Sequence, residues 1–263
     1  MDCILSSSLT GGLLTLTLNR KDQGNALNVE LNEALLQALS GARNDDRVRA
    51  ILIRGAGEHF CMGPDIGTMA DEYEWAFDFS HRVSSLRRLM EVSRLIHEIP
   101  IPVVSALHGT VSGPGLALAL ASDIRIADES TRLTTGFARL GLSGGYGGVY
   151  FLTRLLGSAR ARELLLMSPE LRAADGLNMG LVTRVVPSGA LDAEAFDLAM
   201  GLAEGPTTSF GCIKQNVSMA EQGSIAETLD IEAENHVLCT LTADHREASS
   251  AFRERRKPGF IGV

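Results

Sequence analysis

The sequence predicts an α/β fold in which parallel strands alternate with helices, followed by a helical C-terminal region. Short strand-like runs that end in glycines alternate with stretches whose apolar residues recur at helical spacing. Strands separated by single helices indicate parallel βα units, whose ligands bind at the carboxyl ends of the strands. With 263 residues, 45% of them hydrophobic, the chain is long enough to bury one sizeable core.

The first part of the chain predicts two strands and two helices. "LLTLTLNR" (Leu13–Arg20) alternates apolar and polar residues, as a strand does, and a leucine stripe between residues 27 and 39 predicts a helix that Gly41 closes. Val48–Arg54 is the second predicted strand. The segment Asp71–Ile99 predicts one long amphipathic helix. Its apolar face comprises Trp75, Phe79, Val83, Leu86, Met90 and Leu95.

The rest of the chain continues the alternation and then becomes helical. Pro100 and Pro102 end the long helix, and "PVVSALHG" predicts a third strand. "LALALASDIRIAD" predicts a short helix and a strand around Ile124–Ala127. A glycine loop, "GLSGGYGG", precedes two helices, "GLVTRVVP" is a last strand, and from Leu191 onward the pattern is helical to the basic "RERRKPGF".

The composition disfavours several classes of protein. A net charge of −8 argues against a nucleic-acid surface, and the longest apolar run is far too short to cross a bilayer. The N-terminus has no basic signal-peptide region, and the four cysteines form no CxxC pair. We therefore expect a cytoplasmic protein without a metal site. The glycine stretches lack the G-x-G-x-x-G and P-loop spacings, so no bound nucleotide cofactor is expected.

Four stretches in this order resemble the crotonase (enoyl-CoA hydratase/isomerase) superfamily: "LNRKDQGNALN", "GAGEHFCMGPDIGTM", "IPVVSALHGTVSGPGLALALASDIRIAD" and "RLGLSGGYGGVYFLTRLLGSARARELLL". With "LNMGLVTRVVP" and "ADHREASSAFRERRKPGF", the resemblance covers nearly the whole chain. It implies a ββα superhelix at residues 1–195 and a C-terminal helical trimerisation region at 196–263. It also implies a homotrimer or hexamer that binds an acyl-CoA, with coenzyme A as part of the substrate.

Family members hold the thioester carbonyl between two backbone N–H groups that stabilise an enolate, in an oxyanion hole. The resemblance places the first donor between Gly and Asp of "FCMGPD", at Pro64, and the second at the middle of a glycine triplet, here Gly113-Pro114-Gly115. Proline has no backbone N–H. Both donor positions, Pro64 and Pro114, therefore lack the group that the family mechanism uses.

The acidic positions of the family are also vacant. The two glutamates that act as general acid and base in the hydratases correspond to Ala117 and Phe137, and an aspartate that some members carry in the glycine loop corresponds to Gly145. The glycines that shape both turns remain. The resemblance thus implies that the acyl-thioester pocket is present but lacks the groups that catalyse the usual reaction of the family.

Few polar residues near this pocket are candidates for catalysis. Tyr146 lies in the glycine loop, where it either points at the acyl group or fills the space beside Ala117. Ser112 either offers a hydroxyl donor or braces the turn, and Asp65 is either catalytic or structural, the structural interpretation being favoured.

Four further polar residues have structural or solvent-exposed interpretations. Asp78 and His81 would be neighbours on a helix, although a solvated face explains them and Tyr73 as well. His108 has a structural interpretation.

The segments that match the coenzyme A-binding segments of the family are better preserved than the catalytic positions. Lys21, Ala26 and Leu27, within "KDQGNAL", match the adenine-side loop of the family, and Lys257 and Phe260 match its C-terminal contacts to the adenosine end. A solvated basic helix end is the alternative for the C-terminal segment.

We therefore expect a member of this family that binds an acyl-CoA-like thioester with non-standard or strongly reduced hydratase chemistry. The alternatives are a non-catalytic acyl-CoA-binding protein and a C–C-bond hydrolase that acts on a free ketone or diketone.

Overall fold

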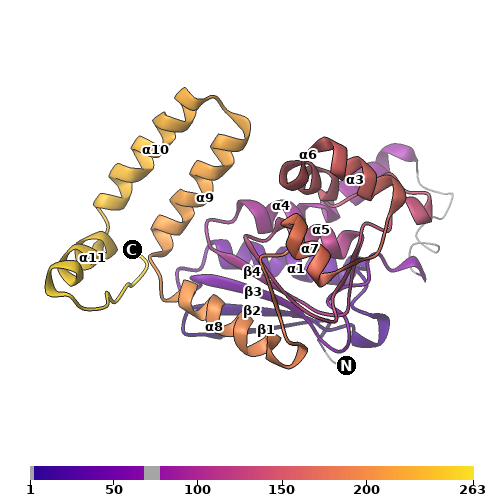
Figure 1. The fold of residues 1–263 in the computed structure, drawn as a ribbon, viewed down its shortest axis with the longest axis horizontal. Coiled ribbons are helices and arrows are strands. Elements are labelled where there is room, and N and C mark those ends of the chain that lie inside the picture. Colours follow the sequence, from indigo (N-terminus) through magenta and orange to yellow (C-terminus); the bar gives the residue numbers. More distant parts are fainter. Residues whose placement is uncertain (1–2, 68–77) are drawn as a thin grey trace.

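The computed structural model describes residues 3–67 and 78–263, and it confirms the predicted α/β class (Figure 1). Its main sheet has six strands in the order β1-β2-β3-β4-β6-β9, all parallel except for the antiparallel β1–β2 pair. These strands are β1 (Leu5–Thr10), β2 (Leu13–Leu18), β3 (Ala50–Gly55), β4 (Val103–Leu107), β6 (Ile124–Asp128) and β9 (Arg184–Val186). A second, three-stranded sheet contains β5 (Thr110–Ser112), β7 (Arg132–Thr134) and β8 (Leu171–Arg172).

The main sheet is buried on both faces. Successive residues of a strand point to opposite faces, so Ile51 and Ile53 of β3 pack into one hydrophobic cluster and Ala50 and Leu52 into another. The first cluster includes residues of α1 (Val29–Arg43), α4 (Glu91–Glu98) and α5 (Pro114–Ala121). The second cluster is covered by the single helix α8 (Leu191–Ala203).

Several predicted element boundaries were wrong. Gly41 does not close the first helix: α1 continues to Arg43 and is capped by Asn44. Strand β1 was missed because its serines give no apolar alternation, and only Leu5 of this strand is buried. Strands β5, β7 and β8 are two or three residues long, too short for a periodic signal.

The long helix predicted at Asp71–Ile99 is two helices in its described part. Asp78 caps α3 (Phe79–Leu89) by accepting a 2.7 Å hydrogen bond from the His81 N–H, and Met90 separates α3 from α4. The predicted apolar face is exposed on α3, where Phe79 is 82% exposed. Trp75 lies outside the described residues. Periodicity identified a shared face but not whether other elements cover it.

The helices after the sheet follow the predicted order. Gly157 interrupts α6 (Gly148–Met167) with non-helical backbone (φ 74°, ψ 162°), which confirms the prediction of two helices there. The remaining helices are α7 (Ala173–Met179), α9 (Thr207–Gln222), α10 (Ile225–Thr240) and α11 (Ala243–Glu254). The predicted boundary between residues 195 and 196 falls inside α8, and the division into two regions stays a prediction. Within the described part of the chain, no helix has the length and apolar character needed to cross a membrane.

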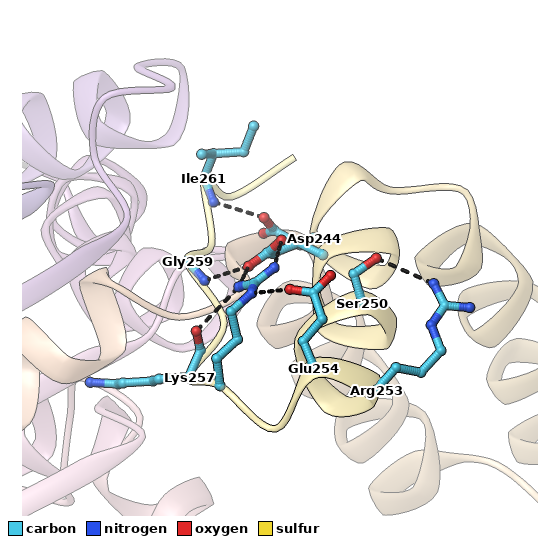
Figure 2. A network of polar contacts seen from close by, with 9 residues as sticks. Asp244, Ser250, Arg253, Glu254, Lys257, Gly259 and Ile261 are labelled. Atoms are coloured by element: carbon cyan, nitrogen blue, oxygen red, sulfur yellow. Dashed lines mark hydrogen bonds and ion pairs between the residues drawn. The ribbon is translucent and has the colours of Figure 1, made fainter.

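The C-terminal tail is held by a polar network on α11 (Figure 2). The buried carboxylate of Asp244 accepts hydrogen bonds from the N–H groups of Ile261 (2.7 Å) and Gly262 (2.8 Å). The Glu247 carboxylate accepts from the Gly259 N–H at 3.0 Å and pairs with the Arg256 guanidinium. The tail that carries Lys257 and Phe260 is therefore fixed to the protein.

The tail network is expected to weaken in acid. Hydrogen bonds from Arg256 and from the Gly259 N–H lower the pKa of Glu247 from 4.5 to about 2. Because the pKa of Glu247 is lowered in the folded protein, its ionised carboxylate stabilises the tail network at pH values above 4.5. This stabilisation is lost as the pH falls from 4.5 towards 2. After correction for the intrinsic exchange rate at each pH, hydrogen exchange of the tail amides should become faster as the pH falls from 4.5 towards 2. Glu247→Gln should already show fast exchange at neutral pH, whereas equal, pH-independent protection in both proteins would contradict the assignment.

Candidate functional site

The two turns that carry the predicted donor positions lie next to each other. The segment after β3 runs alongside β5, because the Phe60 N–H donates to the His108 carbonyl at 2.9 Å and the Ser112 N–H donates to the Cys61 carbonyl at 3.0 Å. Gly63, at φ 113°, then turns the chain in a conformation that favours glycine. A Cβ on Gly63 would lie 3.3 Å from the Ser112 carbonyl oxygen. The turn before Pro64 thus needs glycine on both steric and conformational grounds.

The missing N–H of Pro64 leaves the local backbone pairing intact. Leu27 donates its N–H to the Gly63 carbonyl at 2.8 Å and accepts from the Asp65 N–H at 3.0 Å, so the bonds pass on either side of Pro64. A proline is therefore accommodated there without loss of a strand-like hydrogen bond. What is lost is the one N–H that faces away from this pairing.

Arg20 fixes the Pro64 turn to the predicted coenzyme A loop. Its guanidinium forms an ion pair with the Asp65 carboxylate at 2.6 Å and also donates to the Ala26 carbonyl. Both side chains of the pair are largely buried, at 12% and 16% exposure. This contact favours the structural interpretation of Asp65. The sequence analysis missed Arg20, because nothing in the local spacing connects it with a residue 45 positions away.

Loss of the Arg20 guanidinium is expected to destabilise the fold. Arg20→Met leaves the Asp65 carboxylate and the Ala26 carbonyl without this donor, which should lower the free energy of unfolding by about 2 kcal/mol. Urea unfolding measures the change. The matched control is Arg47→Met, which removes an ion pair with Asp45 whose arginine is 79% exposed and should leave the urea midpoint unchanged. Equal midpoints for the two variants would contradict the structural role of Arg20.

Asn25 shapes the rest of this loop. Its buried side-chain amide donates to the carbonyls of Ala56 (2.8 Å) and His59 (2.7 Å) and accepts from the Arg20 N–H at 2.9 Å, while its backbone is left-handed (φ 54°). The loop that carries Lys21, Ala26 and Leu27 is therefore anchored to the segment before Gly63. Ala26 and Leu27 are buried, and Lys21 is exposed.

Pro114 occupies the first position of α5. Gly113 precedes it with positive φ (49°), and the first α-helical hydrogen bond runs from the Ala117 N–H to the Gly113 carbonyl at 3.0 Å. The N–H groups of the first helical turn have no intrahelical partner, so proline there removes a donor without weakening the helix. The N–H of Gly115 comes next at this helix end.

The ring of Phe137 lies where the predicted catalytic positions converge. A Cβ on Gly113 would lie 3.8 Å from Phe137 Cζ and 3.7 Å from Pro64 Cδ. On Gly145 it would lie 3.7 Å from Phe137 Cε1, and on Gly148 3.9 Å from Phe137 Cε2. The ring is buried at 6% exposure. It therefore fills space between the first oxyanion position and the glycine loop.

The other vacant acid positions adjoin this ring. A Cβ on Gly148 would lie 3.5 Å from the Ala117 Cβ, and Ala117 is fully buried. The described structure thus brings Pro64, Pro114, Ala117, Phe137 and Gly145 into one neighbourhood, as the resemblance predicts.

Two candidate hydroxyl groups differ in their placement. Ser112 Oγ lies at the turn, since a Cβ would approach it to 3.7 Å from Gly63 and to 2.9 Å from Gly136. Tyr146 is 7% exposed, packs within the main hydrophobic cluster and has left-handed backbone (φ 53°), which is unusual for a bulky residue. Ser112 therefore adjoins the oxyanion region, and Tyr146 belongs to the buried wall of the glycine loop.

The remaining polar candidates have structural contacts. Asp78 caps α3 through the backbone N–H of His81, and the His108 Nε2 contacts the Gly57 carbonyl at 3.1 Å. Tyr73 lies outside the described residues. Cys61 sits inside the turn, where its side chain is fully buried and burial raises the pKa of its thiol to about 12.

The two segments predicted to bind coenzyme A lie at opposite ends of the sheet. Lys21–Leu27 follow the carboxyl end of β2, whereas the Phe260 carbonyl accepts from the Arg49 guanidinium at 3.2 Å, at the amino end of β3. Because β2 and β3 are parallel, these are opposite edges. A single chain does not bring Lys257 and Phe260 to the loop of Lys21.

A large cavity in the described structure lies away from this site. It measures about 1040 Å³ and lies between α9 and the loops around Pro100 and Asp123, with the Lys214–Asp123 ion pair (2.8 Å) in its wall. Its described lining residues include none of the predicted site residues. Among the described residues, no group of three or more His, Cys, Asp or Glu side chains is placed to hold a metal ion.

Comparison with known proteins supports the resemblance. Residues 9–262 match the family Enoyl-CoA hydratase/isomerase. The chain is 36% identical over its whole length, and 99% of the relative's, to 1,2-epoxyphenylacetyl-CoA isomerase of Escherichia coli (strain K12). It is 30% identical to the short-chain-enoyl-CoA hydratase of Clostridium acetobutylicum, covering 94% of this chain and 93% of the relative.

The fold is shared with solved structures as well. A crystal structure from Streptomyces coelicolor A3(2), of a protein assigned as an enoyl-CoA hydratase, superimposes with a TM-score of 0.95 at 33% identity, covering 100% of this chain and 96% of that one. The crotonase-like architecture expected from the sequence is therefore confirmed.

Proposed function

Because this chain belongs to the enoyl-CoA hydratase/isomerase (crotonase) family, we propose that it binds an acyl-CoA thioester and does not carry out ordinary enoyl-CoA hydration. The observation that carries this proposal is the buried Phe137 ring, which lies beside Gly113 where the resemblance places an acid near the oxyanion donors. The turn at Pro64 keeps its backbone hydrogen bonds, and the Arg20–Asp65 ion pair joins it to the loop proposed to bind coenzyme A. In this proposal coenzyme A is part of the substrate, no other cofactor takes part, and the protein acts in the cytosol.

The remaining donors favour weak polarisation of the thioester. Without N–H groups at Pro64 and Pro114, polar groups beside these two positions include the Ser112 hydroxyl and the N–H of Gly115 at the start of α5. Each oxyanion donor typically contributes about 2.7–4 kcal/mol of transition-state stabilisation. We therefore assign Ser112 a donor role and regard Tyr146 and Asp65 as parts of the wall and of the loop anchor.

Binding and turnover are separated by titration calorimetry combined with product analysis. A saturated acyl-CoA should bind at one site per chain, and a free β-diketone without coenzyme A should not. Incubation with an enoyl-CoA should leave the substrate unchanged or isomerised, without a hydroxyacyl product. Diketone binding and cleavage without thioester binding would favour a C–C-bond hydrolase, and rapid hydration would overturn the proposal.

We also propose that the coenzyme A site is completed by a second copy of the chain in a homotrimer or hexamer. The carrying observation is the separation of Lys257 and Phe260 from the Lys21–Leu27 loop within one chain. Light scattering with gel filtration should give the mass of three or six chains. A monomer that binds acyl-CoA with full affinity would contradict this arrangement.

Lys257 provides a specific test. Lys257 is exposed, and Lys257→Ala should weaken acyl-CoA binding about fivefold, the value of one exposed charge pair with a phosphate. Binding of an acyl-pantetheine, which lacks the adenosine phosphates, should not change. The matched control is Arg253→Ala, another exposed cation of the same region. An equal loss of affinity for both ligands would show that Lys257 does not contact the adenosine end.

A further inference from the structure

Two cysteines face each other across the helical hairpin formed by α9 and α10. The two helices run side by side (Figure 1), and the Asn235 amide of α10 sets their register by donating to Gln215 (3.1 Å) and Asn216 (2.6 Å) of α9. Cys212 lies one turn before Asn216, and Cys239 lies one turn after Asn235. Because the helices are antiparallel, these displacements have the same direction and bring both cysteines to the same level.

Cys212 is the buried member of this facing pair. Burial, together with the neighbouring Cys239 side chain, raises the pKa of Cys212 to about 11. Cys212 is 8% exposed, whereas Cys239 is half-buried and accessible to small molecules. Each thiol therefore has a defined place in the pair: Cys239 at the surface and Cys212 behind it.

We propose that Cys212 and Cys239 form a redox modification site that hydrogen peroxide converts to an intrachain disulfide. The Cys239 sulfur attacks a peroxide oxygen, the O–O bond breaks, and water leaves with the formation of a sulfenic acid. The Cys212 sulfur then attacks the Cys239 sulfur while its proton passes to the leaving hydroxyl group, so the S–O bond breaks and a second water leaves as the S–S bond forms. In total, the two thiols lose two electrons to one peroxide molecule.

The other cysteines are not placed for this chemistry. Cys61 is fully buried in the turn before Gly63, where its S–H points at the Gly63 carbonyl at 3.9 Å. Cys3 is exposed and donates its S–H to the Leu5 carbonyl at 3.1 Å. Cys212 and Cys239 thus form the facing pair among the described cysteines.

The disulfide would join α9 to α10 next to the large cavity. Cys212, Lys214 and Asn235 all line that cavity, so a covalent bond here holds its helical wall in one arrangement. In a reducing cytosol the pair is expected to be reduced, and the bond forms only under oxidative conditions. The disulfide would then link α9 and α10 covalently until it is reduced again.

Peptide mapping of the full-length protein tests the site. After treatment with hydrogen peroxide and alkylation of free thiols, trypsin should release residues 185–214 joined to residues 215–246, and reduction with dithiothreitol should separate them. Hydrogen exchange in α9 and α10 should slow on oxidation. Cys212→Ser and Cys239→Ser should each abolish the cross-link, whereas Cys3→Ser should retain it.

The alternative outcomes are distinct. A cross-link between two chains, seen as a disulfide-linked dimer that persists in Cys3→Ser, would overturn the intrachain site. So would irreversible oxidation of Cys239 alone, to a sulfinic acid, with Cys212 still available for alkylation after denaturation. Full recovery of both thiols at peroxide concentrations that oxidise Cys3 would show that the pair is not a redox site.

Discussion

Hydration of crotonyl-CoA by this protein is expected to be slower by about 10⁴-fold or more than hydration by a family member with intact donors and acids. Each missing oxyanion donor costs roughly 10²–10³ in rate and each missing acid or base roughly 10²–10⁴, and the effects are not additive. The measurement is the loss of enoyl-thioester absorbance under saturating substrate. The short-chain-enoyl-CoA hydratase of Clostridium acetobutylicum, at 30% identity, is the reference enzyme.

One control makes this result informative. Thermal unfolding in the presence of acyl-CoA must show that the protein is folded and binds the ligand, so that a low rate reflects chemistry. Turnover within tenfold of the reference enzyme would contradict the assignment of Pro64, Pro114, Ala117 and Phe137 as vacant catalytic positions.

Phe137→Ala is expected to lower the free energy of unfolding by about 3–5 kcal/mol, because it empties a buried site that the surrounding glycines cannot refill. The ring is 6% exposed and lies against Gly113, Gly145 and Gly148. Urea unfolding measures the loss. Phe137→Leu keeps most of the volume and should recover most of the stability.

The matched control is Phe79→Ala. Phe79 is 82% exposed on α3, and its removal should change stability by no more than about 0.5 kcal/mol. If Phe79→Ala and Phe137→Ala lower the free energy of unfolding by the same amount, the Phe137 ring does not fill the space between the first oxyanion position and the glycine loop.

The neighbourhood of the site was predictable from the sequence, because glycines fix its geometry. Gly63 and Gly113 have positive φ, and a Cβ on Gly115 would lie 2.6 Å from the Cys61 carbonyl oxygen, so the two turns tolerate little variation. Motifs anchored by such residues keep their register, and Pro64, Pro114 and Ala117 can be located by counting from them.

Contacts between distant segments were not predictable in this way. The Arg20–Asp65 pair joins residues 45 positions apart, and the facing positions of Cys212 and Cys239 depend on how two helices align along each other. The exposed face of α3 illustrates a related limit: helical periodicity reports that Phe79, Val83 and Leu86 share a face, but burial depends on neighbouring elements. Local pattern gives the elements, and tertiary packing decides their surroundings.

Isotope-edited infrared spectroscopy of a bound enoyl-CoA, labelled at the thioester carbonyl, tests the central claim most directly. An oxyanion hole polarises this carbonyl and lowers its stretching frequency. In the present protein the frequency should stay close to that of the free thioester in solution, and in Pro64→Ala combined with Pro114→Gly it should fall towards the value in the Clostridium acetobutylicum hydratase. A large downshift in the unmodified protein would contradict the account, because it would show a strong oxyanion hole despite the two prolines.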